Sequence, residues 1–210
     1  MPTYDLIVEA IIAGEENQVV TLVNQALSQG AEPQDILRNG LIAGMEIVGK
    51  RFRGGEMFLP EVLLCAEVMH KGLDIVNPLL AKAGHKGVGT VVIGTVEGDI
   101  HDIGKRIVGL LLEGNGFEVI DLGVDVKTDT FIQAIEKHKP AILGMSALLT
   151  TTMPYMGKTI DLLKEKGLRD HVKVIVGGAP VSQQFAESIG ADGYAEEAGS
   201  AVELANKLIG

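Results

Sequence analysis

The sequence of 210 residues predicts an N-terminal four-helix bundle followed by an α/β part with a five-stranded, doubly wound parallel sheet. Between residues 4 and 80, apolar residues recur at spacings of three and four, the period of an amphipathic helix. After residue 90, short β-rich segments alternate with helical patterns, which is typical of parallel strands joined by helices. These two patterns predict the fold class.

The helical half divides at glycine and proline residues. Pro33 and Pro60 lie at or near the first turn of a helix, where proline is tolerated. The predicted helices cover 3–12, 16–28, 34–52 and 60–82. The stretch "AKAGHKGVG" (81–89) shows no periodicity, so we expect a hinge within 83–89. The predicted domains are a helical domain over 1–83, a linker over 84–89 and an α/β domain over 90–210.

Five strands are predicted in the second half. They are "TVVIGTV" (90–96), "FEVIDLG" (117–123), "AILGMSA" (141–147), "VKVIVGG" (172–178) and a weaker "DGYA" (192–195). Helices are expected at 103–114, 128–138, 154–166, 182–189 and 198–208. Five such units favour the flavodoxin-like strand order 2-1-3-4-5 over the six-stranded dinucleotide type.

In that order, ligands bind beyond the carboxyl ends of the strands, in the crevice between strands 1 and 3. Three conspicuous segments follow strands: "EGDIHDIG" (97–104), "SALLTTT" (146–152) and "GGAP" (177–180). The sequence therefore predicts that His101 and Ser146 face each other across this crevice.

The pair Asp99 and His101 carries the chemistry of the first segment. Asp99 can accept a proton from one imidazole nitrogen, which leaves the other nitrogen as a Lewis base. Ordinary structural roles remain open as well: His101 as a solvated surface group, Asp102 as the N-cap of the next helix, and the hydroxyl run 150–152 as a cap before Pro154.

The composition argues against several classes of partner. A formal net charge of −10 disfavours nucleic acid and anionic membranes, because both would be repelled at long range. Cys65 is the single cysteine, which rules out an internal disulfide. No secretory signal or long apolar span opens the sequence, so we expect a cytoplasmic protein that binds neither nucleic acid nor membrane.

Two related folds do not fit the residues. A phosphate-accepting receiver domain needs an aspartate after strand 3 and a lysine after strand 5, where this sequence has Ser146 and Glu196. A flavin-binding domain needs a phosphate loop after strand 1, where Glu97, Asp99 and Asp102 would repel the phosphate.

Taken together, Asp99-x-His101-x-x-Gly104, Ser146-x-Leu148 and Gly177-Gly178 resemble the signature of cobalamin-binding (corrinoid) proteins of the methionine-synthase type. The segment "MEIVGKRFRGGEMFLPEVLLCAEVM" (45–69) is similar to the helical cap module of the same family. A chain with both modules resembles the small corrinoid proteins of methyltransferase systems.

The resemblance implies a role for each matching residue. His101 would bind the cobalt of a cobalamin or related corrinoid from below, in the base-off state, and Asp99 would tune it. Thr152 stands where the family often has a serine that links this pair to solvent. Phe58 and Val68 would shield the upper face of the corrinoid. The complete expected cofactor site comprises Gly98, Asp99, Ile100, His101, Asp102, Ile103, Gly104, Ser146, Leu148, Thr150, Gly177, Gly178, Ala198, Phe58 and Val68.

The implied function is that of a methyl carrier. The corrinoid would shuttle a methyl group between a substrate-specific methyltransferase and a methyl-acceptor methyltransferase, and a reductive activator would maintain it. Two alternatives are a cobalamin-binding sensor or regulatory protein and a metal-dependent hydrolase built on Glu97, Asp99, His101 and Asp102. The sensor would normally carry a further signalling module, and the hydrolase would need more ligands than one loop supplies.

Overall fold

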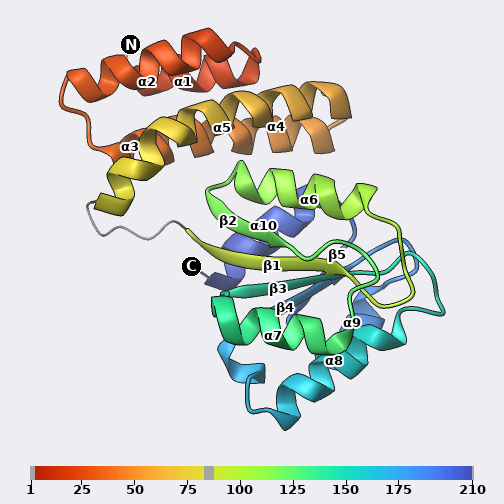
Figure 1. The fold of residues 1–210 in the computed structure, drawn as a ribbon. Helices are drawn as coiled ribbons and strands as arrows, with labels where there is room; N and C mark the ends of the chain where they lie inside the picture. The colour runs from red at the N-terminus through yellow and green to blue at the C-terminus, as the bar shows by residue number, and fades with distance from the viewer. Residues whose placement is uncertain (1–2, 83–87, 210) are drawn as a thin grey trace. The chain divides into compact units, whose positions relative to one another are not determined.

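The computed structural model describes residues 3–82 and 88–209 (Figure 1). Residues 83–87, which contain most of the predicted linker and hinge, lie outside the described residues. None of the helices within the described ranges is both long and apolar enough to span a membrane.

The first part of the chain is helical. Its elements are α1 (Thr3–Ile12), α2 (Glu16–Ser28), α3 (Pro33–Ile36), the π-helical η1 (Leu37–Ile42), α4 (Ala43–Arg53) and α5 (Leu59–Lys82). The predicted helix over 34–52 is thus one continuous run whose middle is π-helical. An amphipathic pattern does not reveal this wider turn, because one additional residue per turn leaves the apolar face nearly continuous.

Small residues let α1 pack closely against this run. A Cβ atom at Gly40 would lie 3.1 Å from Ile7 Cγ2, and one at Gly44 would lie 3.0 Å from Ile11 Cβ. Ile7 and Ile11 are fully buried, so a larger residue at either glycine would displace core side chains.

The second part contains a five-stranded sheet of order β2-β1-β3-β4-β5 in which neighbouring strands are parallel, as predicted. The strands are β1 (Gly89–Thr95), β2 (Phe117–Asp121), β3 (Ile142–Ser146), β4 (Lys173–Gly177) and β5 (Gly193–Ala195). The connecting helices are α6 (Ile103–Glu113), α7 (Thr128–His138), α8 (Pro154–Glu165), the short 3₁₀ helix η2 (Arg169–His171), α9 (Gln183–Ile189) and α10 (Ala198–Ile209).

Helices cover both faces of the sheet, with α7, α8 and α9 on one face and α6 and α10 on the other (Figure 1). Side chains from α7, α8 and α9 and from the central strands form one apolar core. Its largest members include Phe131, Ile132, Leu143, Met145, Met156, Ile160 and Leu163. Burial on both faces explains why these strands read as continuous apolar runs in the sequence.

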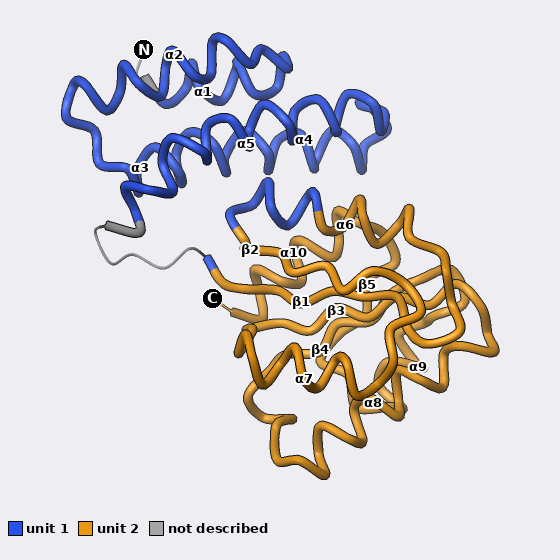
Figure 2. The backbone as a smooth tube through the Cα atoms, in the orientation of Figure 1, with its two compact units in different colours: residues 1–88, 110–116 blue, residues 89–109, 117–210 orange. Residues whose placement is uncertain are grey.

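The chain separates into two compact units (Figure 2). The first comprises residues 1–88 with 110–116, and the second comprises 89–109 with 117–210. The domain boundaries expected from the sequence remain a prediction.

A buried ion pair links α6 to the end of β2 within the α/β part. Lys105 Nζ contacts both carboxylate oxygens of Asp121, whose Oδ1 also accepts a hydrogen bond of 2.8 Å from the Gly123 N–H. The Lys105 side chain is 4% exposed and that of Asp121 is 37% exposed. The ammonium therefore depends on this partner, whereas the carboxylate can also be hydrated.

We predict an asymmetric response to breaking this pair. Asp121→Asn leaves the buried ammonium without its counter-charge and should lower the free energy of unfolding by about 2–3 kcal/mol. Lys105→Met removes the buried charge and should cost less than about 1 kcal/mol. Urea unfolding measures both, and the exposed pair Lys164–Asp161, at 3.0 Å, serves as a control in which Lys164→Met should have little effect. Equal losses for the two buried-pair variants would contradict this account.

Candidate functional site

The loops that carry the predicted residues leave the same edge of the sheet. Thr95 at the end of β1 is paired with Ser146 at the end of β3, which is paired with Gly177 at the end of β4. The segments 97–104, 146–152 and 177–180 therefore begin side by side.

Asp99 is the centre of the site, with its side chain fully buried. Its Oδ1 lies 2.7 Å from His101 Nδ1 and accepts the His101 backbone N–H at 3.1 Å. Its Oδ2 accepts the N–H groups of Leu148 at 2.7 Å and Leu149 at 3.2 Å. The Thr152 hydroxyl lies 2.9 Å from the same oxygen. One carboxylate thus joins the loops that follow β1 and β3.

These contacts keep Asp99 ionised. Burial by itself raises the pKa of a carboxyl group, but the donors from Leu148, from the ring and backbone of His101 and from Thr152 oppose it. The net effect lowers the pKa of Asp99 from 3.8 to about 2. At neutral pH Asp99 is therefore an acceptor only, and His101 Nδ1 must be the donor.

The geometry leaves the other ring nitrogen of His101 available. The His101 side chain is 48% exposed, and Nε2 forms no hydrogen bond with the residues that the structure describes. With Nδ1 protonated toward Asp99, Nε2 carries the lone pair of the neutral imidazole. This is the arrangement found around a histidine that binds a metal through Nε2.

Apolar side chains are exposed at the same edge of the sheet. Ile100 lies in the loop after β1, and Ile103 is the first residue of α6. Leu148 and Leu149 lie in the loop after β3, and Val124 lies in the loop after β2. Their exposed fractions range from 37% to 76%. Exposed apolar side chains gathered on one edge are typical of a surface that a ligand or partner covers.

The described residues contain no cluster of three or more His, Cys, Asp or Glu side chains that could hold a metal ion. The metal-dependent hydrolase considered from the sequence would need such a cluster. A single free imidazole beside an apolar surface instead fits a metal that arrives with its own equatorial ligands in a macrocycle, as in a corrinoid.

The glycines of the site are under different steric constraints. Gly178 has a φ of +125°, and a Cβ there would lie 1.9 Å from the Ala147 carbonyl oxygen. A Cβ at Gly177 would lie 2.9 Å from the Ala195 carbonyl oxygen. The fold itself requires both residues. At Gly104 a Cβ would meet nothing within 4 Å, so the space around it is open.

The remaining predicted site residues differ in how deeply they are buried. Ser146 is half-buried at the end of β3, Thr150 is exposed, and Ala198 is half-buried at the start of α10. Thr152 is 4% exposed, and its hydroxyl also lies 2.9 Å from the Leu149 carbonyl. A link from Thr152 to solvent stays a prediction. The Asp102 carbonyl accepts the Arg106 N–H at the start of α6, as expected for a residue at the N-cap position.

The two residues expected to shield a cofactor from above behave differently within the helical unit. Phe58 is 69% exposed, whereas Val68 is 1% exposed and belongs to the buried core. The burial of Val68 supports the ordinary reading of an apolar helical stripe as core. Phe58 remains the better candidate for a cofactor contact.

Sequence reasoning missed several of the hydrogen-bonding groups that hold the site together. The backbone N–H groups of Leu148 and Leu149 carry no residue-type signal. Thr95, fully buried, donates from its hydroxyl to the His101 carbonyl at 2.8 Å. Asp125, after β2, accepts the Gly98 N–H at 2.7 Å. An acidic residue at the same edge of the sheet was the one available signal for Asp125.

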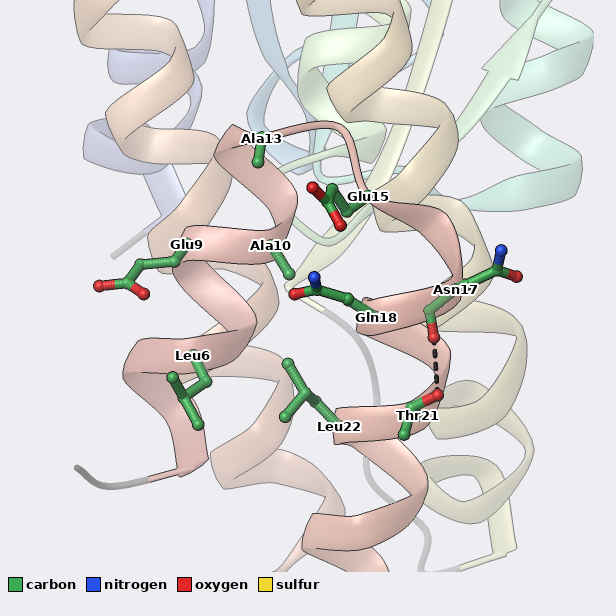
Figure 3. A pocket seen from close by; sticks show the side chains of 9 residues that line it. All are labelled: Leu6, Glu9, Ala10, Ala13, Glu15, Asn17, Gln18, Thr21 and Leu22. Carbon is green, nitrogen blue, oxygen red and sulfur yellow. Dashed lines mark hydrogen bonds between the residues drawn. The ribbon is translucent and has the colours of Figure 1, made fainter.

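A separate hollow of about 590 Å³ lies between α1 and α2 (Figure 3). Leu6, Ala10 and Leu22 line it together with the carboxylates of Glu9 and Glu15. Its lining includes no residue predicted for the cofactor.

Known proteins resemble the chain along its whole length. Residues 89–203 match a family model described as B12 binding domain, and residues 3–77 match a second model of the same description. A corrinoid protein of Desulfitobacterium hafniense (strain Y51) is 48% identical over 100% of this chain and 99% of its own length. The trimethylamine corrinoid protein of Methanosarcina barkeri is 46% identical over 92% of this chain and 90% of its own.

The fold also matches a solved structure. One chain in the crystal structure of the methanol:cobalamin methyltransferase complex from Methanosarcina barkeri aligns with a TM-score of 0.86 and 38% identity. The alignment covers 99% of this chain and 79% of that chain.

We predict that the charge of Asp99 stabilises the apo-protein in a defined pH window. Because the folded pKa is depressed, this stabilisation is present above the unfolded value of 3.8 and is lost as pH falls toward 2. The difference in unfolding free energy between wild type and Asp99→Asn should shrink by about 2 kcal/mol between about pH 5 and about pH 2. Urea unfolding at several pH values measures it, with the exposed Asp161→Asn as control. A pH-independent difference would contradict the pKa assignment.

Gly178→Ala should be strongly destabilising. Its φ disfavours any L side chain, and the Ala147 carbonyl occupies the space of the new methyl group, so we expect a loss of at least about 3 kcal/mol. Gly167 has a φ of +69° with open space around it, and Gly167→Ala should cost only about 1 kcal/mol. Similar losses in urea unfolding would show that the contact with Ala147 is unimportant.

Proposed function

Because the chain belongs to the family of corrinoid proteins with a B12 binding domain, we propose that it is a methyl carrier. In this proposal it binds cobalamin or a related corrinoid in the base-off state, with His101 as the lower ligand of cobalt. The bound cobalt supplies the chemistry of methyl transfer, and the protein supplies position and electrostatics. The observation that carries the proposal is the His101–Asp99 pair with Nε2 free.

The residues of the site would share the work. Asp99 holds the imidazole in one tautomer and orientation, and Thr152 helps to hold Asp99. The exposed side chains of Ile100, Ile103 and Leu148 give the macrocycle an apolar surface to cover. Further proposed contacts of the corrinoid and its nucleotide tail are Gly98, Asp102, Gly104, Ser146, Thr150, Gly177, Gly178 and Ala198.

The helical part would act as a cap, with Phe58 as the exposed contact above the corrinoid. A cap that excludes water protects a reactive cofactor, but it must move for a partner protein to reach the cobalt. The proposed partners are a substrate-specific methyltransferase, a methyl-acceptor methyltransferase and a reductive activator in the cytoplasm. The relatives named for trimethylamine and for methanol:cobalamin methyltransferase support this class of partner.

The ligand assignment can be tested with protein containing histidine labelled with the heavy nitrogen isotope and reconstituted with cobalamin. The EPR spectrum of its Co(II) form should show hyperfine splitting from the labelled nitrogen, which distinguishes histidine from the cofactor's own base. His101→Ala should lose this splitting, and Asp99→Asn should weaken corrinoid binding on the order of 10–100-fold.

His171→Ala provides the matched control, because His171 is exposed in η2 and far along the chain from the site. It should behave as wild type. A wild-type protein that takes up no corrinoid would show that the proposed function is wrong. If the protein takes up the corrinoid but shows no histidine splitting, only the ligation by His101 is refuted, and corrinoid binding stands.

A further inference from the structure

A second carboxylate, Asp125, is bonded to the loop that carries His101. Asp125 Oδ1 accepts the Gly98 N–H at 2.7 Å, and the Asp125 N–H donates to the Asp99 carbonyl at 2.8 Å. These two bonds hold both ends of the Gly98–Asp99 dipeptide, which lies immediately before the proposed ligand. Asp125 belongs to the loop between β2 and α7, and the tertiary fold brings this loop next to the loop after β1.

The backbone of Asp125 is unusual. Its φ is +52°, and Lys139 is the other non-glycine residue with positive φ among those described. Lys139 is the left-handed C-cap of α7, which is an ordinary place for this conformation. Asp125 caps no helix, because α7 has Lys127 at its N-cap position. The strained conformation of Asp125 instead directs its N–H and its carboxylate toward the Gly98–Asp99 dipeptide.

The loop of Asp125 rests on the end of β1. The Thr95 N–H donates to the Gly123 carbonyl at 3.0 Å, and the Val126 N–H donates to the Thr95 carbonyl at 2.9 Å. Val126 is 5% exposed and forms a parallel bridge with Val96. Asp125 is thus flanked by residues tied to the sheet, and it can act as a fixed support for the turn beside it.

From these contacts, we infer that Asp125 is a positioning residue for His101. By holding the Gly98–Asp99 dipeptide, it sets the direction in which the Asp99 carboxylate points, and Asp99 in turn orients the imidazole. The hydrogen bonds of Asp125 are to Gly98 and Asp99, so it acts on His101 through them. This inference rests on the proposed ligation of cobalt by His101.

Two variants separate the contributions of Asp125. Asp125→Gly keeps the positive φ and the backbone N–H but removes the carboxylate that accepts the Gly98 N–H. Asp125→Asn keeps an acceptor oxygen and tolerates the left-handed conformation. Lys139→Gly relieves the same kind of strain away from the site and is the matched control.

The first measurement uses the apo-protein and is independent of the cofactor. Amide hydrogen exchange should show the Gly98 N–H protected in wild type and in Asp125→Asn, and exchanging on the order of 10-fold faster in Asp125→Gly. Unchanged Gly98 exchange in Asp125→Gly would overturn the inference, whatever the protein binds.

The second measurement uses protein reconstituted with cobalamin and labelled histidine. Asp125→Gly should show a smaller fraction of cobalt with the histidine splitting and about 10-fold weaker binding, while its urea unfolding transition shows that it is still folded. Asp125→Asn and Lys139→Gly should retain the splitting. The same histidine-ligated fraction in Asp125→Gly and wild type would overturn the positioning role. Absence of the splitting in wild type would instead refute the proposed ligation, and this inference with it.

Discussion

The site depends on one buried charge, the carboxylate of Asp99. A carboxylate without exposure to water is tolerated only where donors replace its hydration. Here the donors come from two loops that lie far apart in the sequence. His101 follows β1, whereas Leu148, Leu149 and Thr152 follow β3 and lie 49 to 53 residues beyond Asp99. Separating these loops would leave the charge unsatisfied, so the carboxylate keeps them together and orients the imidazole as a consequence.

The parallel sheet makes this arrangement possible. Its register brings the ends of β1, β3 and β4 to one edge, so backbone N–H groups point to where the carboxylate lies. Gly178 lets the loop after β4 pass against the Ala147 carbonyl without a side chain. Both carboxylate oxygens of Asp99 are occupied by donors of the site. The second imidazole nitrogen of His101 is left for a ligand, at an edge of the sheet that also exposes apolar side chains.

Much of this architecture could be predicted from the sequence. The strands lie within two residues of their predicted bounds, because a buried parallel strand is a short apolar run that ends at polar or glycine residues. The strand order follows from five alternating units. The pairing of Asp99 with His101 is also local, since only Ile100 stands between them. The π-helical turn in the middle of 34–52 was missed, because its apolar face resembles that of an ordinary helix.

The sequence by itself therefore determined the fold class, the edge of the sheet at which the three loop segments meet, and the pairing of His101 with Asp99. Only the tertiary structure decided that Leu148 and Leu149 donate backbone N–H groups to Asp99, that Asp125 supports the same turn, and that Val68 is core. The physical reason is that these contacts join backbone atoms or surfaces distant in sequence. Their formation depends on strand register and loop conformation, which residue types and their spacing do not encode locally.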